Sequence, residues 1–254
     1  MELKSIIKKV PGARWLYRQC VLGRRRIHRM IYGPPKSELY DIQTVEVMRR
    51  ALRQDSTCLD VGAHTGNILR QILTIAPLGR HYAVEALPHL AARLKSEFPM
   101  VQVHDCAVAD KDGDAMFNFV ENAPAYSGLQ QRVYNRPDPI IKQIPVKVCR
   151  IDDLIPGGVK IDLIKCDIEG GEYHAFLGAM KTLQRCKPIV VFECGLGAAD
   201  YYKTTPDMMF SVINDAGLKL STMARWLADE TAYDRARFVK AFTEGEDYYY
   251  IAYP

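Results

Sequence analysis

Two carboxylates that follow a strand-like run are the clearest candidates for catalytic groups in this sequence. Asp167 follows the run of residues 161–166, and Glu169 lies two positions further along. A carboxylate held beside a hydroxyl group can accept its proton, as an alcohol requires when it acts as a nucleophile. Asp167 is therefore the first candidate for a general base, and Glu169 is the second, as a base or as a ligand of the substrate hydroxyl. Lys165 is expected to form a structural ion pair with Glu193, with direct catalysis as the alternative.

A second group of residues is typical of a cofactor-binding turn. Asp60 ends an apolar run and precedes Gly62 and Gly66, which lack a Cβ and so allow a ligand to approach, while the helix that follows offers N–H donors. Dinucleotide-binding turns carry three glycines and place the acid on the second strand. An acid on the first strand would repel a pyrophosphate but suits the ammonium group of S-adenosylmethionine (SAM). The turn favours SAM over NAD and predicts these cofactor contacts: Asp60, Gly62, Ala63, His64, Gly66 and Asn67.

Strand-like and helix-like segments alternate along most of the chain and predict how these groups are positioned. Residues 172–183 are expected to form one helix, and residues 187–193 a central strand. Two further strand candidates follow at residues 218–222 and 248–252. This order predicts a three-layer α/β/α sandwich with a mostly parallel sheet. In such sheets ligands bind at the carboxyl ends of the strands.

Polar residues at the other predicted strand ends define further ligand contacts. Glu85 ends the second strand, where its two oxygens can accept hydrogen bonds from both ribose hydroxyls. Asp105 ends the third strand, so that it lies near the adenine edge together with the backbone of the next two residues. The strand ends thus add these cofactor contacts to those of the turn: Glu85, Asp105, Cys106, Ala107 and Asp167.

A long polar segment interrupts the alternation after the third helix-like region. Residues 119–143 are expected to form an inserted substrate loop, because long loops in compact domains usually serve function. The contacts to the acceptor are predicted from position alone. They are four side chains of this loop, one strand end and one tryptophan: Tyr126, Ser127, Gln130, Arg132, Glu193 and Trp226.

Charge is distributed unevenly along the 254 residues. Residues 1–36 contain ten Lys or Arg and one acid and carry +9, so that the remainder carries −5 of the total of +4. We expect this basic segment to form two short amphipathic helices that act as a lid or contact a second copy, with residues 1–30 on an anionic membrane surface as the alternative. No stretch is typical of a secretory signal or a membrane span. The expected protein is cytoplasmic or peripheral at a membrane, with a basic extension at 1–36 and a catalytic domain at 37–254.

Seven cysteines are scattered through the chain without Cys-x-x-Cys spacing. An odd number of unclustered thiols indicates free cysteines in a reducing compartment, and their wide spacing does not match a zinc site. No metal is therefore predicted. Oxygen ligation of Mg²⁺ by Asp167, Glu169 and Glu193 is the less favoured alternative.

Several segments resemble the class I SAM-dependent methyltransferases of the FkbM family. The pattern Lys-x-Asp-x-Glu-Gly-x-Glu, which ends at Glu172, is the most specific of them, and Gly171 stands where family members commonly have Ala. The resemblance covers residues 55–195. It implies a Rossmann-like, seven-stranded sheet with a reversed C-terminal hairpin, SAM as cofactor, and methylation of a hydroxyl group on a sugar, glycan or natural product. The similar segments are residues 59–66, 84–86, 107–113 and 161–172.

Two other classes of function stay open at this point. Lys165, Asp167 and the basic segment would suit a nucleic-acid 2′-O-methyltransferase, but such an enzyme needs a basic groove, and the charge outside residues 1–36 is −5. The other class is a SAM-binding protein without catalysis or a nicotinamide-binding oxidoreductase, and Asp60 argues against the latter. The predicted partner is a small-molecule or glycan acceptor, nucleic acid is not expected, and a homodimer is considered.

Overall fold

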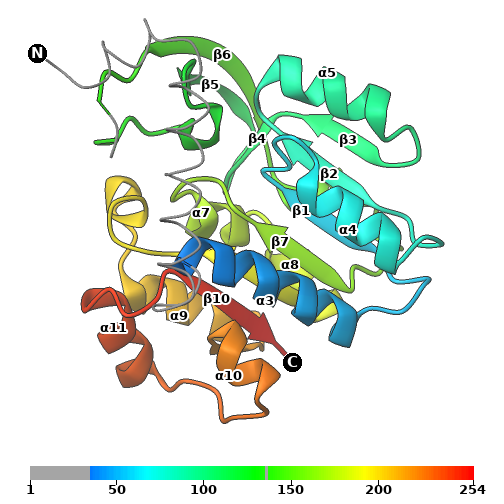
Figure 1. Ribbon diagram of the computed structural model, residues 1–254, viewed down its shortest axis with the longest axis vertical. Helices are drawn as coiled ribbons and strands as arrows, with labels where there is room; N and C mark the ends of the chain where they lie inside the picture. The colour runs from blue at the N-terminus through cyan, green and yellow to red at the C-terminus, as the bar shows by residue number, and fades with distance from the viewer. Residues whose placement is uncertain (1–34, 135–136) are drawn as a thin grey trace, which may run out of the picture. The chain divides into compact units, whose positions relative to one another are not determined.

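The computed structural model of this protein describes residues 35–134 and 137–254. The basic segment, with its predicted amphipathic helices and its lid, dimer or membrane contacts, lies largely outside the described residues. The chain divides into two compact units, residues 1–42 and 43–254. The described part of the first unit forms the beginning of helix α3 (Lys36–Ala51), and the elements below belong to the second unit (Figure 1).

A seven-stranded sheet forms the centre of the second unit. Its strands lie in the order β3-β2-β1-β7-β8-β10-β9, and β10 runs antiparallel to both of its neighbours while the others are parallel. This order confirms the predicted Rossmann-like sheet, in which the two C-terminal strands form an antiparallel pair at one edge. The strands are β1 (Cys58–Val61), β2 (Tyr82–Glu85), β3 (Gln102–Asp105), β7 (Leu163–Cys166), β8 (Ile189–Glu193), β9 (Lys219–Ser221) and β10 (Tyr249–Tyr253).

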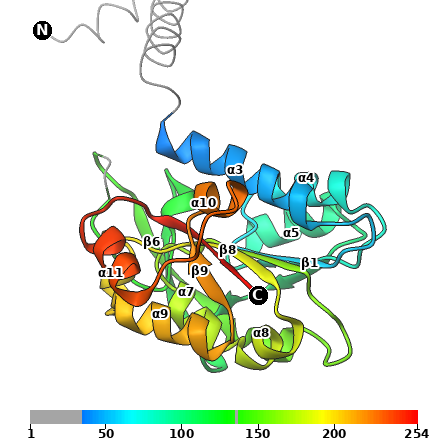
Figure 2. The same cartoon turned by 90° about the horizontal axis from the view of Figure 1, so that it is seen from below.

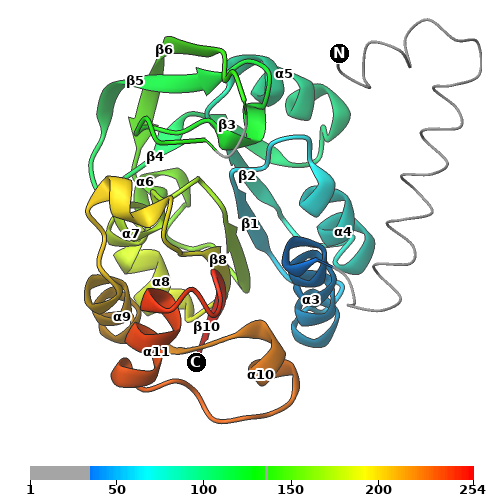
Figure 3. The same ribbon diagram turned by 60° about the vertical axis from the view of Figure 1, so that its left-hand side comes forward.

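Helices cover both faces of this sheet, as Figures 2 and 3 show. On one face, Met48 of α3, Leu69 and Leu94 pack with Cys58 and Leu163 of the sheet. Besides α3, the helices of this face are α4 (Asn67–Ile75) and α5 (Pro88–Glu97). The short helix α10 (Met223–Leu227) joins α3 through a hydrogen bond from Thr44 to Met223 Sδ, 3.5 Å long.

The opposite face carries the larger apolar cluster. Phe176, Met209 and Phe238 of its helices pack with Leu59 and Ile164 of the sheet. Apolar side chains at helical spacing therefore face the sheet from both sides, and the predicted three-layer sandwich is confirmed. The helices of this face are α7 (Glu172–Leu177), α8 (Met180–Cys186), α9 (Pro206–Asp215) and α11 (Arg235–Thr243).

Residues 172–183 do not form the single helix that the sequence predicts. The structure has α7 and α8 instead, and they are separated at Gly178. A Cβ at Gly178 would lie 2.0 Å from the carbonyl oxygen of Ala109, and the carbonyl of Gly178 accepts a hydrogen bond from Asp152 N, 2.9 Å long. The break thus follows from a close backbone contact with the segment after β4, which the local sequence does not reveal.

A second, smaller sheet explains the predicted insertion. It has the order β4-β6-β5 and contains β4 (Ala107–Val108), β5 (Gly113–Val120) and β6 (Ile141–Cys149). Its apolar face, with Phe117 and Val146, packs on Leu87 and Leu90 at the start of α5. Only the ends of the predicted substrate loop, residues 119–120 and 141–143, belong to β5 and β6, and the short 3-10 helix η1 (Pro124–Tyr126) lies in the segment that joins the two strands.

The remaining short helices are α6 (Ile151–Leu154) and the 3-10 helix η2 (Ala199–Tyr202), which follows β8. Within residues 35–134 and 137–254, no helix combines the length and the apolar character that crossing a membrane requires.

Candidate functional site

Strand alternation places the predicted catalytic side chains on one face of the sheet. Ile164 and Cys166 of β7 belong to the larger apolar cluster, so Lys165 and the following Asp167 lie on the opposite face. The same argument holds for Glu193, which follows the buried Phe192, and the parallel strands end at the same edge. The sequence pattern thus positions a polar patch at the carboxyl edge of β7 and β8, on the side of α3 and α4.

The glycine turn after β1 is tightly packed against the protein itself. Gly62 has a φ of +80°, and a Cβ there would lie 2.0 Å from the carbonyl oxygen of Asp167. Gly66 has a φ of +77°, and its Cβ would lie 2.4 Å from the ring of Phe98. We expected the missing Cβ atoms to leave room for a ligand, but protein atoms occupy that room at both positions. The glycines are needed because the turn approaches the end of β7 and the helix α5.

The backbone hydrogen bonds of this turn also stay within the protein. Gly62 N and Ala63 N donate to the carbonyl of Val84, at 2.9 and 3.1 Å. His64 N donates to Glu85 Oε2 at 2.7 Å. The turn is thus fixed to the end of β2, and these three amides are not available to a ligand. Asn67, the first residue of α4, is exposed, and its side chain accepts a hydrogen bond from Arg70.

Asp60 is the buried group of this region that lacks a partner. Its side chain is fully buried, and neither carboxylate oxygen has a hydrogen-bond partner among the described residues. Burial raises the pKa of Asp60 to about 7, although the ammonium of Lys165, its neighbour in the sheet register, acts in the opposite direction. An unpaired buried carboxylate is costly, and a bound cation would relieve that cost. Asp60 therefore fits the ammonium end of SAM.

Glu85 and Asp105 lie side by side at the ends of β2 and β3. Glu85 is buried and accepts hydrogen bonds from the backbone of His64 and from Leu87 N, the latter 2.9 Å long. Each of its oxygens keeps a second lone pair, so the carboxylate is fixed in place and still able to accept from hydroxyls. Asp105 is exposed, and the next residue, Cys106, is buried where the chain turns into β4. This geometry fits the predicted ribose and adenine contacts.

Asp167 receives two donors on one oxygen. Lys165 Nζ donates to Asp167 Oδ2 at 2.9 Å, and the hydroxyl of Tyr249 donates to the same oxygen at 2.5 Å. Burial alone would raise the pKa of Asp167, but Lys165 and Tyr249 outweigh it and hold that pKa at about 2. The predicted ion pair of Lys165 is therefore made with Asp167, and the expected pairing with Glu193 is replaced by it.

Tyr249 is a site residue that the sequence did not indicate. It lies on β10 directly opposite Glu193 of β8, so the reversed strand delivers its hydroxyl to the carboxyl edge of the sheet. Burial raises the pKa of Tyr249 well above its ordinary value, and the hydroxyl stays protonated as a donor. Tyr249 is 82 residues away from Asp167 in the sequence. Only its place near the start of the last predicted strand could have pointed to it.

Three carboxyl groups gather at this edge. One oxygen each of Asp167, Glu169 and Glu193 lies within 4.8 Å of the others. Burial, with the negative charge of Asp167, raises the pKa of Glu193 well above its ordinary value, and Glu193 shares a hydrogen bond with Asp167. These oxygens are the ligands that Mg²⁺ would use. Asp167 and Glu169 also have positively charged side chains beside them, those of Lys165 and Arg132.

The turn that carries Glu169 is held in an unusual conformation. Glu169 has a φ of +61° and Gly170 a φ of +105°, where a Cβ would lie 2.4 Å from the carbonyl of Ala198. Glu172 is 1% exposed and accepts a hydrogen bond from Ile168 N at 2.8 Å. Burial raises the pKa of Glu172 to about 8. Glu172, the last acid of the motif, therefore stabilises the turn that places Glu169 beside Asp167.

The segment between β5 and β6 reaches this turn through Arg132. Arg132 forms an ion pair with Glu169, and the two side chains are 11% and 16% exposed. Arg132 Nη1 also donates to the carbonyl of Gly197 at 3.3 Å. Gln130 N donates to the hydroxyl of Tyr202, and Val133 N donates to the hydroxyl of Tyr201, each at 3.2 Å. Both tyrosines belong to η2. These hydrogen bonds place the acceptor segment, residues 124–134, over the carboxylates.

The other predicted acceptor contacts lie in different surroundings. Ser127 is buried, and its hydroxyl accepts from Val120 N at 3.0 Å, so it stabilises the acceptor segment from within. Trp226 lies with its ring under Arg50 and near Tyr253. Tyr253 stands four residues after Tyr249 on β10, about 13 Å along the strand. This geometry gives no support to an acceptor contact by Trp226.

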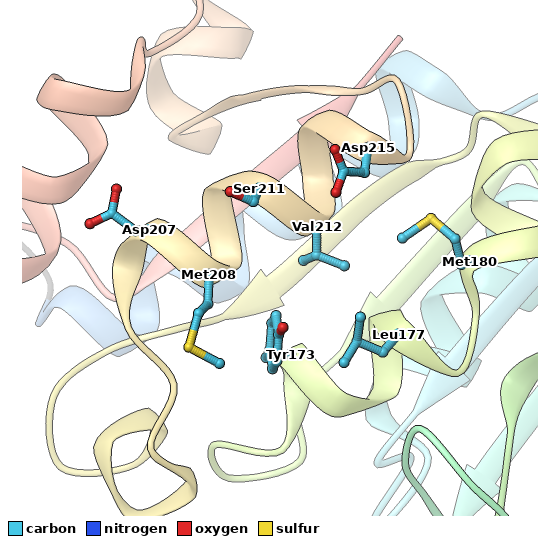
Figure 4. A pocket seen from close by; sticks show the side chains of 8 residues that line it. All are labelled: Tyr173, Leu177, Met180, Asp207, Met208, Ser211, Val212 and Asp215. Carbon is cyan, nitrogen blue, oxygen red and sulfur yellow. The ribbon is translucent and has the colours of Figure 1, made fainter.

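A surface pocket on the other side of the sheet contains none of the predicted site residues. Its volume is about 290 Å³, and it lies among α7, α8 and α9 (Figure 4). Apolar side chains dominate its lining, which consists of Tyr173, Leu177, Met180, Asp207, Met208, Ser211, Val212 and Asp215.

A family comparison agrees with the sheet order and the acidic edge. The family model described as "Methyltransferase FkbM domain" matches residues 60–220, which is more than half of the chain. The chain belongs to the FkbM methyltransferase family. FkbM membership confirms the resemblance drawn from the motifs, and with it SAM as the cofactor. The unpartnered carboxylate of Asp60 is the structural observation that fits this cofactor.

Several solved structures are similar to this FkbM chain at low sequence identity. An FkbM methyltransferase from Methylobacillus flagellatus is 16% identical with a TM-score of 0.47, over 80% of this chain and 44% of that one. A TehB-like SAM-dependent methyltransferase from Corynebacterium glutamicum is 14% identical with a TM-score of 0.42, over 93% and 96%. Aeropyrum pernix fibrillarin with natively bound SAM is 13% identical with a TM-score of 0.42, over 80% and 69%. No curated protein sequence matches this chain.

Proposed function

We propose that this FkbM methyltransferase transfers a methyl group from SAM to a hydroxyl group of a sugar, glycan or natural product. The carboxylate cluster of Asp167, Glu169 and Glu193 at the carboxyl edge of β7 and β8 carries this proposal. It lies on the same face of the sheet as Asp60, the group that fits the SAM ammonium, because Asp60 and Lys165 are partners in the register of β1 and β7. The arrangement offers hydrogen-bond acceptors to a hydroxyl nucleophile next to the cofactor.

In this mechanism the residues of the chain orient the acceptor and take up its proton. SAM, when bound, supplies a methyl group on a positively charged sulfur. As the new O–CH₃ bond forms and the S–CH₃ bond breaks, the hydroxyl oxygen gains positive charge and its proton becomes strongly acidic. A carboxylate with a pKa of about 2, such as Asp167, can accept that proton late in the reaction. Glu169 accepts a hydrogen bond from the same or a neighbouring hydroxyl, and S-adenosylhomocysteine is released.

Charge at the cluster favours a neutral acceptor over nucleic acid. Asp167 and Glu169 are balanced by Lys165 and Arg132, so no positive charge is left there for a phosphate backbone. The chain outside residues 1–36 also carries −5. These observations support a hydroxyl acceptor without phosphate groups.

Replacement of the proposed base tests the function. With tritiated SAM and a cell extract separated into carbohydrate, nucleic-acid and small-molecule fractions, we expect wild-type label in the carbohydrate or small-molecule fraction. Asp167→Asn should lower the rate by at least about 100-fold, since general-base catalysis contributes that much or more. Calorimetry should show that this variant still binds SAM.

The control is Asp229→Asn, which also removes an ion-paired carboxylate; Asp229 is paired with Arg50 at the surface and is 76% exposed. It should transfer methyl groups like the wild type. Label confined to nucleic acid would refute the acceptor class. An Asp167→Asn protein of normal stability and normal rate would refute the base.

A further inference from the structure

Two polar groups in the acceptor segment are buried without a partner. The hydroxyl of Tyr134 and Nε of Arg132 have no hydrogen-bond partner among the described residues. Tyr134 is 9% exposed, and the Arg132 side chain is 11% exposed. The ring centre of Tyr134 lies 5.8 Å from the guanidinium carbon of Arg132, so the two side chains pack against each other. A buried donor or hydroxyl without a partner is costly, and proteins normally satisfy it.

This site borders the carboxylate cluster. The guanidinium of Arg132 uses Nη2 for its ion pair with Glu169 and Nη1 for the carbonyl of Gly197, and Nε is its nitrogen without a hydrogen bond among the described residues. Glu169 in turn has an oxygen within 4.8 Å of Asp167. A ligand group that reached Nε would therefore lie beside the position at which the reacting hydroxyl is held.

The chemistry of the site selects its ligand. Arg132 Nε–H can only donate, and the Tyr134 hydroxyl can donate or accept. A hydroxyl group satisfies both, because it accepts from Nε–H while it donates to or accepts from Tyr134. An anion is disfavoured, because the guanidinium charge is already compensated by Glu169 and a second carboxylate, Asp167, lies close to it. The exposed ring of Tyr126, 5.4 Å from the same guanidinium carbon, adds an apolar face at the opening.

We infer that Arg132 Nε and the Tyr134 hydroxyl bind a second hydroxyl of the acceptor, near the one that is methylated. The inference rests on the proposed O-methyl transfer and deepens it. It requires a polyhydroxylated acceptor, such as a sugar ring with neighbouring hydroxyls, and it makes Tyr134 a determinant of acceptor specificity. An acceptor with one isolated hydroxyl would leave both groups unsatisfied.

The experiment uses Tyr134→Phe, which removes the unpartnered oxygen and keeps the ring. Its matched control is Tyr82→Phe, because the hydroxyl of Tyr82 on β2 is also buried without a partner among the described residues. Transfer of tritiated methyl groups is measured against serial dilutions of the neutral carbohydrate fraction of a cell extract. The amount of extract that gives half the maximal rate replaces a KM for the unidentified acceptor.

We expect Tyr134→Phe to need about tenfold more extract for half-maximal rate, the effect of losing one hydrogen bond to a ligand. SAM affinity and the unfolding midpoint should stay the same or rise, since no contact within the free protein is lost. Tyr82→Phe should need the same amount of extract as the wild type. Unchanged saturation of Tyr134→Phe would mean that only water fills the site, and the inference would be overturned.

A second measurement separates this inference from the proposed function. If the wild type labels neither the carbohydrate nor the small-molecule fraction, the acceptor class has failed. The Arg132 Nε–H resonance, assigned by its loss in Arg132→Lys, is then followed by NMR during titration with D-glucose and L-rhamnose. A shift that Tyr134→Phe abolishes supports a hydroxyl site without methyl transfer. The absence of a shift with both sugars overturns it.

Discussion

Asp167 shows how the chemistry of a single residue depends on its neighbours. An isolated buried carboxylate would be protonated, but two donors on Oδ2 keep this one ionised. The pKa of Glu193 is shifted in the opposite direction, because Glu193 is buried and faces the negative charge of Asp167. The two acids therefore ionise over different pH ranges although they adjoin one another, and this difference suits Asp167 to receive a proton and Glu193 to donate a hydrogen bond.

Asp60 should make SAM binding depend on pH. Because the pKa of Asp60 is raised to about 7, a large part of the free protein carries a protonated Asp60 at and below pH 7. A cation stabilises the ionised form, so SAM binding should release a proton there and weaken by up to about tenfold per pH unit below 7. Calorimetry in two buffers of different ionisation enthalpy counts the protons.

Asp60→Asn is the variant that checks this assignment. It should bind SAM more weakly and release no proton from pH 6 to 8. Proton release that persists in Asp60→Asn would assign the titration to another group.

At the scale of elements, the approach of β1 to β7 depends on Gly62. Its φ of +80° is unfavourable for alanine, and a Cβ would meet the carbonyl of Asp167 at 2.0 Å. We expect Gly62→Ala to lower the free energy of unfolding by about 3 kcal/mol. Urea denaturation measures this change.

The control for this prediction is Gly157→Ala, since a Cβ there meets no atom within 4 Å. That substitution should leave stability unchanged or raise it by about 0.4 to 1 kcal/mol. Equal effects of the two substitutions would contradict the close contact.

The acceptor segment should depend on Arg132 for its order. Arg132→Met removes the ion pair with Glu169 and the bond to Gly197, so the amides of Gln130 and Val133 should exchange hydrogen about tenfold faster. Hydrogen exchange with mass spectrometry measures this change without any acceptor. Lys142→Met, which removes an exposed ion pair with Glu121 in the same small sheet, is the control and should leave the exchange unchanged.

The sequence predicted the elements that local pattern determines. The seven main strands were found because apolar runs flanked by turns mark β1, β2, β7 and β8 clearly, and Asp60, Asp167 and Glu169 followed from their place after such runs. Contacts between distant segments were not accessible in this way. The break at Gly178 depends on Ala109, and the role of Tyr249 depends on strand pairing. Helix α11 was missed as well, although Asp234 accepts a capping hydrogen bond from Arg237 N at its start.

For the whole molecule, the buried acids set the dependence of stability on pH. The pKa is raised in the folded state to about 7 for Asp60 and to about 8 for Glu172, and well above its ordinary value for Glu193. Their contribution to the free energy of unfolding is therefore complete below about pH 4 and is lost as the pH rises through these pKa values. Asp167 acts in the opposite way, and its contribution is lost only as the pH falls from about 4 to 2. The free protein should therefore unfold more easily at pH 8 than at pH 5.

Urea denaturation between pH 4 and 9 checks this prediction. Each raised pKa unit corresponds to about 1.4 kcal/mol, and Glu172→Gln should flatten the curve between pH 5 and 8. A stability that rises steadily from pH 5 to 8 would show that these acids are ionised in the folded protein.

The reversed strand β10 also determines when the site can form during folding. β9 precedes β10 in sequence but joins the sheet through it, and Tyr249 reaches Asp167 across 82 residues. Closing so long a segment is entropically costly, so docking of β10 should be among the late events of folding. An intermediate that contains the parallel strands alone would lack the second donor on Asp167. Acquisition of activity during refolding should therefore coincide with the final kinetic phase.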